Sequence, residues 1–360
     1  MLENKAAEGK HDVSRLRRAS VPERASRHLA DTLFDKRALF VTEELRSYAR
    51  TAYHNLLVNL AERFRQELNG RGADIRTDDV IAAFLDTPVD VSPDLASALY
   101  HRSEEARLSK RLRSLSASAF LVGDSEDPET LASAWGREDR QLAARLDAYI
   151  RLRDPRSSEE TGPTLSLDEL GEHLSEALVW RLAGRLAATL ANVKGAHDET
   201  GSGAEAPDLT SFERAAGTIA GEVDIVRSVQ HAAMMLAARI AERGHLGDWL
   251  VMKALLSGDV LLAVSLVAVR ARLSSGTAWL LLIRNMRTSA ATLLRAAGFE
   301  DPAARQILQL LYQASGEEAD TDAARTAADE DYAAVDRQTA QDMLAFWRLD
   351  PRLRSGLEQN

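Results

Sequence analysis

The stretch Gly244–Leu311 decides the fold, and its sequence is GHLGDWLVMKALLSGDVLLAVSLVAVRARLSSGTAWLLLIRNMRTSAATLLRAAGFEDPAARQILQLL. Segments rich in Leu, Ala, Val and Ile alternate with residues that stop or start helices. Gly258 can end one helix, and Asp259 can cap the helix after it. Gly298 ends a later segment, and Asp301-Pro302 can open the next, with Asp as N-cap and Pro in the first turn. The stretch therefore predicts short helices that cover one another.

The composition of the whole chain agrees with a helical protein. Of 360 residues, 45% are hydrophobic and only 5% are aromatic, and Ala and Leu dominate the apolar set. This balance favours helices over β-sheets. The formal net charge of −10 argues against wholesale binding to nucleic acids or anionic membranes. The chain has no cysteine, which excludes disulfides and Cys-ligated metal sites.

Two observations indicate a soluble, cytoplasmic protein without a membrane span. The N-terminus has no apolar segment of the kind that a secretory signal needs. The longest apolar run, Val260–Val269, is about half the length that a bilayer requires.

We therefore predict an all-α fold, built as an array of short capped helices with a long central helical hairpin. Because no clean fixed period is visible, both a HEAT-like α-solenoid and an irregular bundle fit the pattern. Polar linkers at 153–164 and 195–207 divide the chain. They define an N-terminal helical region at 13–152, the hairpin at 165–243 and a C-terminal helical array at 244–348.

The N-terminal region has several helix start signals. A capping box at Ser20 predicts a helix through Phe34, Thr77 starts a short helix to Leu85, and Ser92-Pro93 starts another. Thr42 opens a longer helix with an apolar stripe at every third or fourth position, formed by Leu45, Ala49, Ala52, Leu56, Leu60 and Phe64.

The hairpin is predicted from a second capping box and a heptad pattern. Ser166 and Glu169 form the box and open a helix through Val193. A longer helix follows at 210–243, in which apolar residues recur every seven positions: Phe212, Ile219, Val226, Ala233 and Ile240. This pattern predicts a seam that packs either against the preceding helix or in a homodimer.

Part of the central stretch resembles a known family. The run His245–Phe299 is similar to a bacterial helical family, found mostly in alphaproteobacteria, called domain of unknown function 2336 (DUF2336). The matching features are Gly244 with His245-Leu246, the segment Leu255–Asp259 and the segment Leu293–Phe299. The helix after Asp259 lacks the aromatic residue expected near its start, and the N-terminal half diverges. The resemblance implies an all-helical bacterial protein without assigned chemistry and carries over no catalytic residue.

No phosphate-binding loop, dinucleotide fingerprint, zinc-protease or nucleophile-elbow motif occurs in the chain. The best candidate for a metal site is the set Glu169, Glu172, His173 and Glu176, which share a helix face beside Asp168. Acidic residues in the first turns of a helix also complement its dipole in water. His231 and His245 could be ligands or pH-sensitive groups, although such residues are more often boundary histidines.

Two further groups could bind a partner. The basic run Arg102, Arg107, Lys110, Arg111 and Arg113 could present a helical face to phosphates, and Arg15, Arg17, Arg18, Arg24 and Arg27 form a similar cluster. Interleaved glutamates and the absence of stacking aromatic residues favour a solvated face. Near the C-terminus, Met343, Phe346 and Trp347 could form a docking patch, or the helix could fold back onto the core. Trp249 and Trp279 are expected in the core.

These observations favour a non-catalytic helical protein that binds another protein, such as a scaffold, adaptor or regulator in a bacterial cytoplasm. The pattern predicts no enzyme activity and no cofactor. Two alternatives stay open: a metal-dependent enzyme that uses Glu169, Glu172, His173 and Glu176, and a nucleic-acid binder that uses the face Arg102–Arg113.

Overall fold

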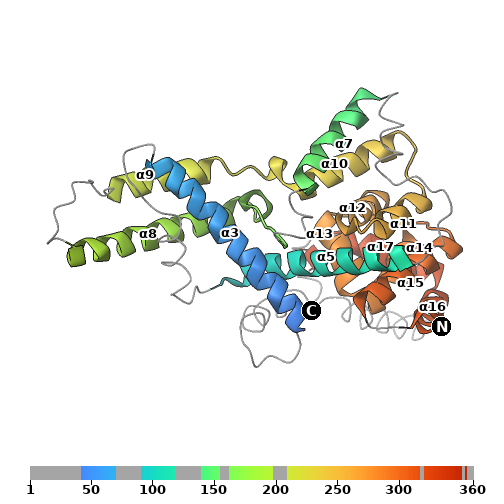
Figure 1. Cartoon of the computed structure of the whole chain (residues 1–360). Helices are drawn as coiled ribbons and strands as arrows, with labels where there is room; N and C mark the ends of the chain where they lie inside the picture. Colours follow the sequence, from blue (N-terminus) through green and yellow to red (C-terminus); the bar gives the residue numbers. More distant parts are fainter. Residues whose placement is uncertain are drawn as a thin grey trace, which may run out of the picture. The chain divides into compact units, whose positions relative to one another are not determined.

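The computed structural model describes residues 42–69, 91–118, 139–154, 162–197, 209–316, 320–350 and 353–354. Every regular element within these ranges is a helix, which confirms the predicted all-α class (Figure 1). The helical repeat stays a prediction. The helices expected at Ser20–Phe34 and Thr77–Leu85, and the arginine cluster from Arg15 to Arg27, lie outside the described residues.

The chain forms two compact units, and each unit combines segments that are distant in sequence. The described residues of Arg107–Arg151 and Ala232–Asn360 belong to unit 1, and those of Ser26–Ala106 and Leu152–His231 belong to unit 2. The helices α5 (Pro93–Ser118) and α10 (Val229–Glu242) contribute residues to both units.

Unit 2 is built around α3 (Glu43–Asn69), α8 (Glu172–His197) and α9 (Leu209–Gly221). Helices α8 and α9 lie side by side, and α3 packs against α9 (Figure 1). The hydroxyl groups of Thr42 and Ser92 accept hydrogen bonds from the backbone at the starts of α3 and α5, as the start signals predict. The predicted stripe of α3 is buried throughout, from Leu45 to Phe64.

The predicted continuous helix from Thr210 to Arg243 is wrong. The segment divides into α9, a short 3₁₀ turn η3 (Ile225–Arg227) and α10. Asp224 accepts a hydrogen bond from Val226 N at 2.9 Å, and Ser228 Oγ accepts one from His231 N at 3.1 Å. These caps lie three and seven residues after Gly221, where α9 ends, so local stop and start signals override the heptad period. As a result, Val226 is 58% exposed, whereas the other four heptad positions are buried.

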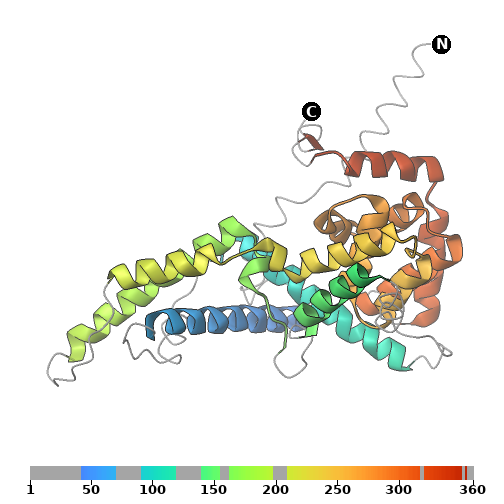
Figure 2. The ribbon, with the colours of Figure 1, turned by 90° about the horizontal axis from the view of Figure 1, so that it is seen from above.

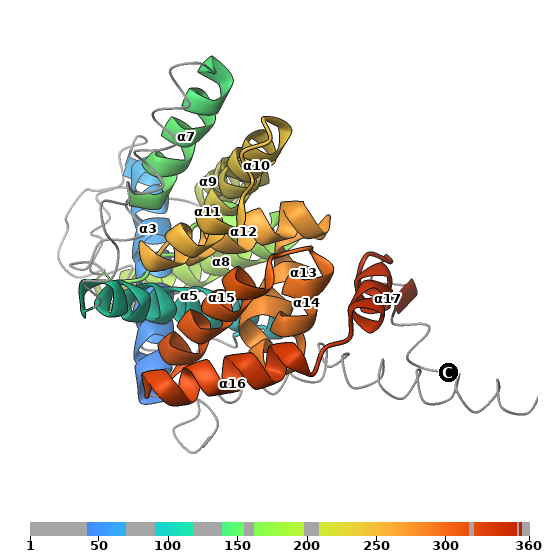
Figure 3. The same cartoon turned by 90° about the vertical axis from the view of Figure 1, so that its right-hand side faces the viewer.

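Unit 1 contains the stretch that decides the fold, and the predicted train of helices is confirmed there. It comprises α11 (Asp248–Leu256), α12 (Val260–Ala271), α13 (Ser275–Trp279), two π-helical turns η4 (Leu280–Arg284) and η5 (Met286–Ala290), α14 (Ala291–Ala296), α15 (Asp301–Ser315), α16 (Thr321–Ala333) and α17 (Arg337–Trp347). Helix α12 is the centre of this core, because nearly all of its side chains are buried. Helices α15 and α16 lie side by side, and α17 packs on α14 (Figure 3).

The joint between α11 and α12 holds three parts of unit 1 together. Gly258 has φ +77°, and Asp259 caps α12 by accepting a hydrogen bond from Leu262 N at 3.1 Å. The same carboxylate accepts a hydrogen bond from Tyr149 Oη of α7 (Arg140–Arg153) at 2.5 Å. Ser116 of α5 donates to the Leu256 carbonyl at 2.5 Å. The joint therefore anchors α5 and α7.

A second joint, at the end of α14, is closed by a single arginine. Arg270 of α12 donates to the carbonyl oxygens of Ala297 and Gly298 at 2.9 and 2.5 Å. Its guanidinium also pairs with Asp248 and lies 4.0 Å from the centre of the Phe299 ring. Because a cation at a helix C-terminus complements the dipole, Arg270 fixes both the end of α14 and the start of α11.

Within the described ranges, no single helix is long and apolar enough to cross a membrane. One bent pair, Val260–Ala271 with Ser275–Arg284, meets the length and composition of a span, with an angle of 110° between its parts. The first of these helices is buried in the core of unit 1.

Candidate protein-binding groove

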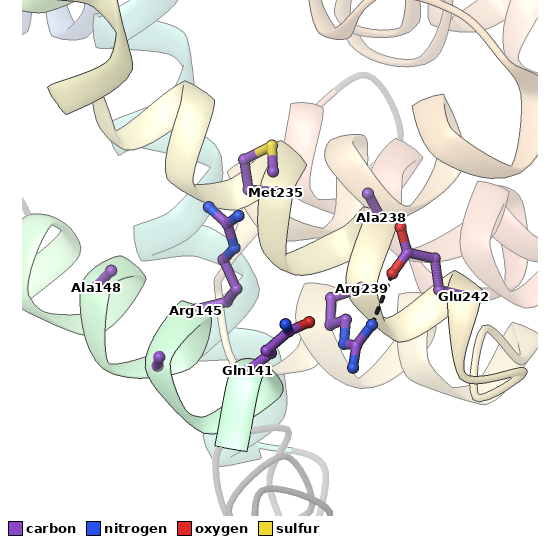
Figure 4. Close-up of a pocket in the computed structure, with 8 residues that line it drawn as sticks. Gln141, Arg145, Ala148, Met235, Ala238, Arg239 and Glu242 are labelled. Atoms are coloured by element: carbon purple, nitrogen blue, oxygen red, sulfur yellow. Dashed lines mark hydrogen bonds and ion pairs between the residues drawn. The ribbon is translucent and has the colours of Figure 1, made fainter. Parts of the chain in front are cut away.

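Figure 2 shows α7 beside α10 in unit 1, and a groove of about 470 Å³ runs between these two helices (Figure 4). Four residues of α7 line one side of it, namely Gln141, Ala144, Arg145 and Ala148. Four residues of α10 line the other, namely Met235, Ala238, Arg239 and Glu242. The groove therefore lies between two helices that are far apart in sequence.

Small side chains give the groove its shape. Ala144, Ala148 and Ala238 leave room for the backbone of a partner to approach, and Met235 adds a flexible apolar side chain. Polar side chains, among them Arg145 and Glu242, lie along the same walls (Figure 4). A groove lined by both small apolar and charged side chains is a surface that an amphipathic helix can bind.

Asp139 sets the position of α7 against α10. Its Oδ1 atom accepts hydrogen bonds from Gln141 N at 2.9 Å and Leu142 N at 3.3 Å, so it caps α7. Its Oδ2 atom accepts hydrogen bonds from the Nε atoms of Arg239 at 2.9 Å and Arg243 at 2.7 Å. One buried carboxylate thus links the start of α7 to Arg239, which lines the groove.

These contacts shift the pKa values of Asp139 and Arg239. Burial raises the pKa of Asp139, but the hydrogen bonds from Leu142, Gln141 and Arg239 outweigh it, so the pKa of this carboxyl lies below its ordinary value. The hydrogen bond to Glu242 and the contact with Asp139 raise the pKa of Arg239, despite its partial burial. Both groups are therefore charged at neutral pH.

Acid should weaken the ion pair between Asp139 and Arg239, and the substitution Asp139→Asn tests how much this pair stabilises the fold. Because the folded-state pKa is lower than the unfolded value of about 3.9, the stabilisation is complete above pH 4 and is lost as pH falls through the folded-state value. We expect the melting temperature of Asp139→Asn to lie below that of the wild type at neutral pH, with the difference shrinking below about pH 4. Thermal unfolding between about pH 3 and about pH 7 measures this difference.

Asp147→Asn is the matched control, because Asp147 lies on the exposed face of the same helix. It should unfold like the wild type at every pH. A gap between Asp139→Asn and the wild type that stays constant into the acid range would contradict the assignment.

The two arginines of the groove differ in their partners. Arg239 is held by Asp139 and by Glu242 at 2.9 Å. Among the residues that the structure describes, the exposed guanidinium of Arg145 contacts no carboxylate. Arg145 is therefore the cation of the groove that can pair with an acidic group from outside.

The structure separates the predicted basic run. Arg107 Nη1 donates to the Ser315 carbonyl at 2.7 Å, and Arg111 Nη1 donates to the same carbonyl at 3.2 Å. Both side chains thereby stabilise the C-terminus of α15. Arg102 lies in unit 2, where it donates to the Thr164 carbonyl and pairs with Glu105. Lys110 is exposed.

The predicted acidic and histidine set is divided between two elements: Glu169 ends the 3₁₀ turn η2 (Leu167–Glu169), and Glu172, His173 and Glu176 lie on α8. Glu169 Oε2 accepts a hydrogen bond from Ser166 N at 2.7 Å, as the capping box predicts. Glu172, His173 and Glu176 are exposed on α8. Over the part of the chain that the structure describes, no group of three His, Asp or Glu side chains is arranged to hold a metal ion. His231 is half-buried and His245 is exposed, and they lie in different units.

The C-terminal aromatic cluster packs against unit 1. Trp347 is buried together with Leu344, whereas Met343 and Phe346 are half-buried. Trp279 is in the core, as predicted. The prediction for Trp249 is wrong, because its side chain is 38% exposed and lies against Lys253, whose Nζ atom is 6.0 Å from the ring centre. The short α11 turns its buried side, at Leu250 and Ala254, away from this residue.

Within the described residues, the fold defines an all-α protein built from capped helices. Residues 124–345, more than half of the chain, match the family model described as an uncharacterised protein conserved in bacteria (DUF2336). The chain belongs to this family, which confirms the resemblance. No curated protein and no solved structure matches the chain.

The groove itself was not among the predicted sites. Its two walls are at least 87 positions apart in sequence, which is the separation of Ala148 and Met235. The one sequence feature that could have indicated the groove was the pair of small residues Ala144 and Ala148 on the exposed face of α7. Without the partner helix, that pattern is the same as on any solvated helix.

Proposed function

We propose that this protein is a non-catalytic scaffold, adaptor or regulator that binds another protein in a bacterial cytoplasm. The observation that carries the proposal is the groove between α7 and α10, which combines small apolar side chains with the exposed cation of Arg145. Its occupant is an amphipathic helix of the partner, with small apolar residues on one face and a carboxylate beside them.

Charge complementarity supports this choice of partner. The arginines Arg140, Arg145, Arg151 and Arg153 lie on α7, and Asp147 is its one acidic residue. A helix with an acidic edge would gain a charge-assisted hydrogen bond with Arg145 without competing for Arg239, which Asp139 already holds. A basic edge would be repelled at the same position.

The experiment compares capture by the wild type and by two groove variants. Ala148→Trp fills the groove with a large side chain, and Arg145→Glu reverses the charge of the exposed arginine that lines it. Both side chains are exposed, so neither change disturbs the core. We expect a specific partner to bind the wild type and to lose at least about tenfold in affinity for each variant.

Arg337→Glu is the matched control, because it reverses an exposed arginine on α17, away from the groove. It should bind like the wild type. A peptide that corresponds to the captured helix should bind with the same ranking, measured by calorimetry. If the partner binds all four proteins equally, or if no partner is captured, the groove is not the binding site.

A further inference from the structure

Helix α8 of unit 2 has a second exposed face that is distinct from the groove. One side of α8 buries Leu178, Val179, Leu182, Ala183 and Leu186 in the core of unit 2. The opposite side exposes four residues, which we call the α8 seam: His173, Ala177, Trp180 and Gly184. Trp180 is 41% exposed, which is unusual for a tryptophan, and a Cβ atom on residue 184 would meet nothing within 4 Å.

The spacing of the α8 seam is that of a coiled coil. Its residues are separated by four, three and four positions, which is the alternation of the a and d positions of a heptad. Ala177 and Gly184 then occupy a positions, and Trp180 occupies the d position between them. In a parallel pair of helices, a d side chain packs into a hole formed by four residues of the partner helix, which include the two flanking a residues and the equivalent d residue.

We propose that the α8 seam binds the α8 seam of a second copy of this chain in parallel orientation. The Trp180 side chain of each copy then packs between Ala177 and Gly184 of the other copy. The small size of these two residues leaves room for the indole ring. A large aromatic side chain flanked by two small residues thus supplies both the protruding and the receiving part of one interface.

The charges beside the seam select both the occupant and its orientation. Glu176 is exposed on one flank, and Arg181, five residues later, is exposed on the other. A spacing of five joins the g position of one helix to the e position of a parallel partner. Parallel pairing therefore places Glu176 of each copy beside Arg181 of the other copy. Antiparallel pairing would place the two glutamates together and the two arginines together.

The short length of the α8 seam limits the affinity of the proposed dimer. It spans about two heptads, which is less surface than a standard interface buries, so the dimer should dissociate on dilution. Sedimentation of the full chain over a range of concentrations should show a monomer–dimer equilibrium. Trp180→Ser should raise the dissociation constant by at least about tenfold, because it removes the central side chain.

A charge exchange separates pairing from folding. Glu176→Arg and Arg181→Glu should each weaken the dimer, because each places like charges together, and the double variant should restore it. Both residues are exposed, so the helicity of all variants should equal that of the wild type. A monomer at every soluble concentration, or single and double variants of equal affinity, would overturn the proposal.

One introduced cysteine tests the orientation, because the chain has no other cysteine. In a parallel pair the two residues at position 177 face each other, so Ala177→Cys should form a disulfide-linked dimer under mild oxidation. Ala334→Cys, exposed at the end of α16 in unit 1, is the control and should stay monomeric. Equal cross-linking of the two variants would exclude the parallel α8 pair.

Discussion

Gly258→Ala should lower the free energy of unfolding by about 2–4 kcal/mol, because two costs add. The residue has φ +77°, a conformation that disfavours any side chain. A Cβ atom on residue 258 would also lie 2.7 Å from the Ser109 carbonyl oxygen and 2.7 Å from Arg113 Cγ. The arginine side chain can move, but the backbone of α5 cannot move without disturbing the joint.

Gly244→Ala is the matched control in the same unit. Gly244 has φ +73°, but a Cβ atom there would meet nothing within 4 Å. This variant therefore pays only the conformational cost, about 1 kcal/mol. Chemical denaturation of both variants measures the difference. Equal losses would mean that α5 does not pack closely on the joint between α11 and α12.

Arg270→Ala should cost about 3 kcal/mol of stability, since it removes several contacts at once. It leaves the carbonyl oxygens of Ala297 and Gly298 without their donor. It also leaves the largely buried carboxylate of Asp248 without its cation, and it removes the cation–π contact with Phe299. Arg270→Lys should recover part of the loss, because an ammonium group can satisfy only some of these partners.

An exposed arginine of unit 1 provides the comparison. Arg325 pairs with Asp322 at 2.9 Å, but both side chains are largely in solvent. Arg325→Ala should therefore change the stability by less than about 0.5 kcal/mol. A loss for Arg270→Ala as small as that of Arg325→Ala, measured by denaturant unfolding, would show that Arg270 does not hold the end of α14.

The parts of the fold that sequence predicted are those that local chemistry decides. Asp259 caps α12 and Gly298 ends α14 in a left-handed conformation, as their residue types indicate. The start of α15 differs by one residue: Glu300 is the N-cap and Asp301 begins the helix, with Pro302 in the first turn. Asp301 and Pro302 marked where α15 starts, but their residue types did not determine which of Glu300 and Asp301 is the N-cap.

What the sequence could not decide depends on contacts between distant segments. The heptad pattern from Phe212 to Ile240 indicated one helix, yet Asp224 and Ser228 broke it locally. The exposure of Trp249 depends on which neighbours the short α11 meets. The groove depends on the distance between α7 and α10, which Asp139 sets through Arg239 and Arg243. None of these contacts leaves a periodic signal.

The residues that carry the family resemblance lie at the joints of unit 1. Leu255–Asp259 forms the joint that anchors α5 and α7, and Leu293–Phe299 ends where Arg270 closes α14. This explains why a family can be identified without any chemical motif. The shared residues maintain a packing arrangement, so the family resemblance does not by itself identify a binding site.

The order in which the segments of unit 1 follow one another has a consequence for biosynthesis. Among the described segments of unit 1, those of Arg107–Arg151 leave the ribosome first, and those from Ala232 onward emerge only after all of Leu152–His231. During that interval Tyr149 has no Asp259 to bind, and α7 has no α10 beside it. Unit 2 can fold first, because its described segments end at His231. A chain that ends at residue 231 and has been released from the ribosome should therefore protect α3, α8 and α9 from protease, while α7 is still cut.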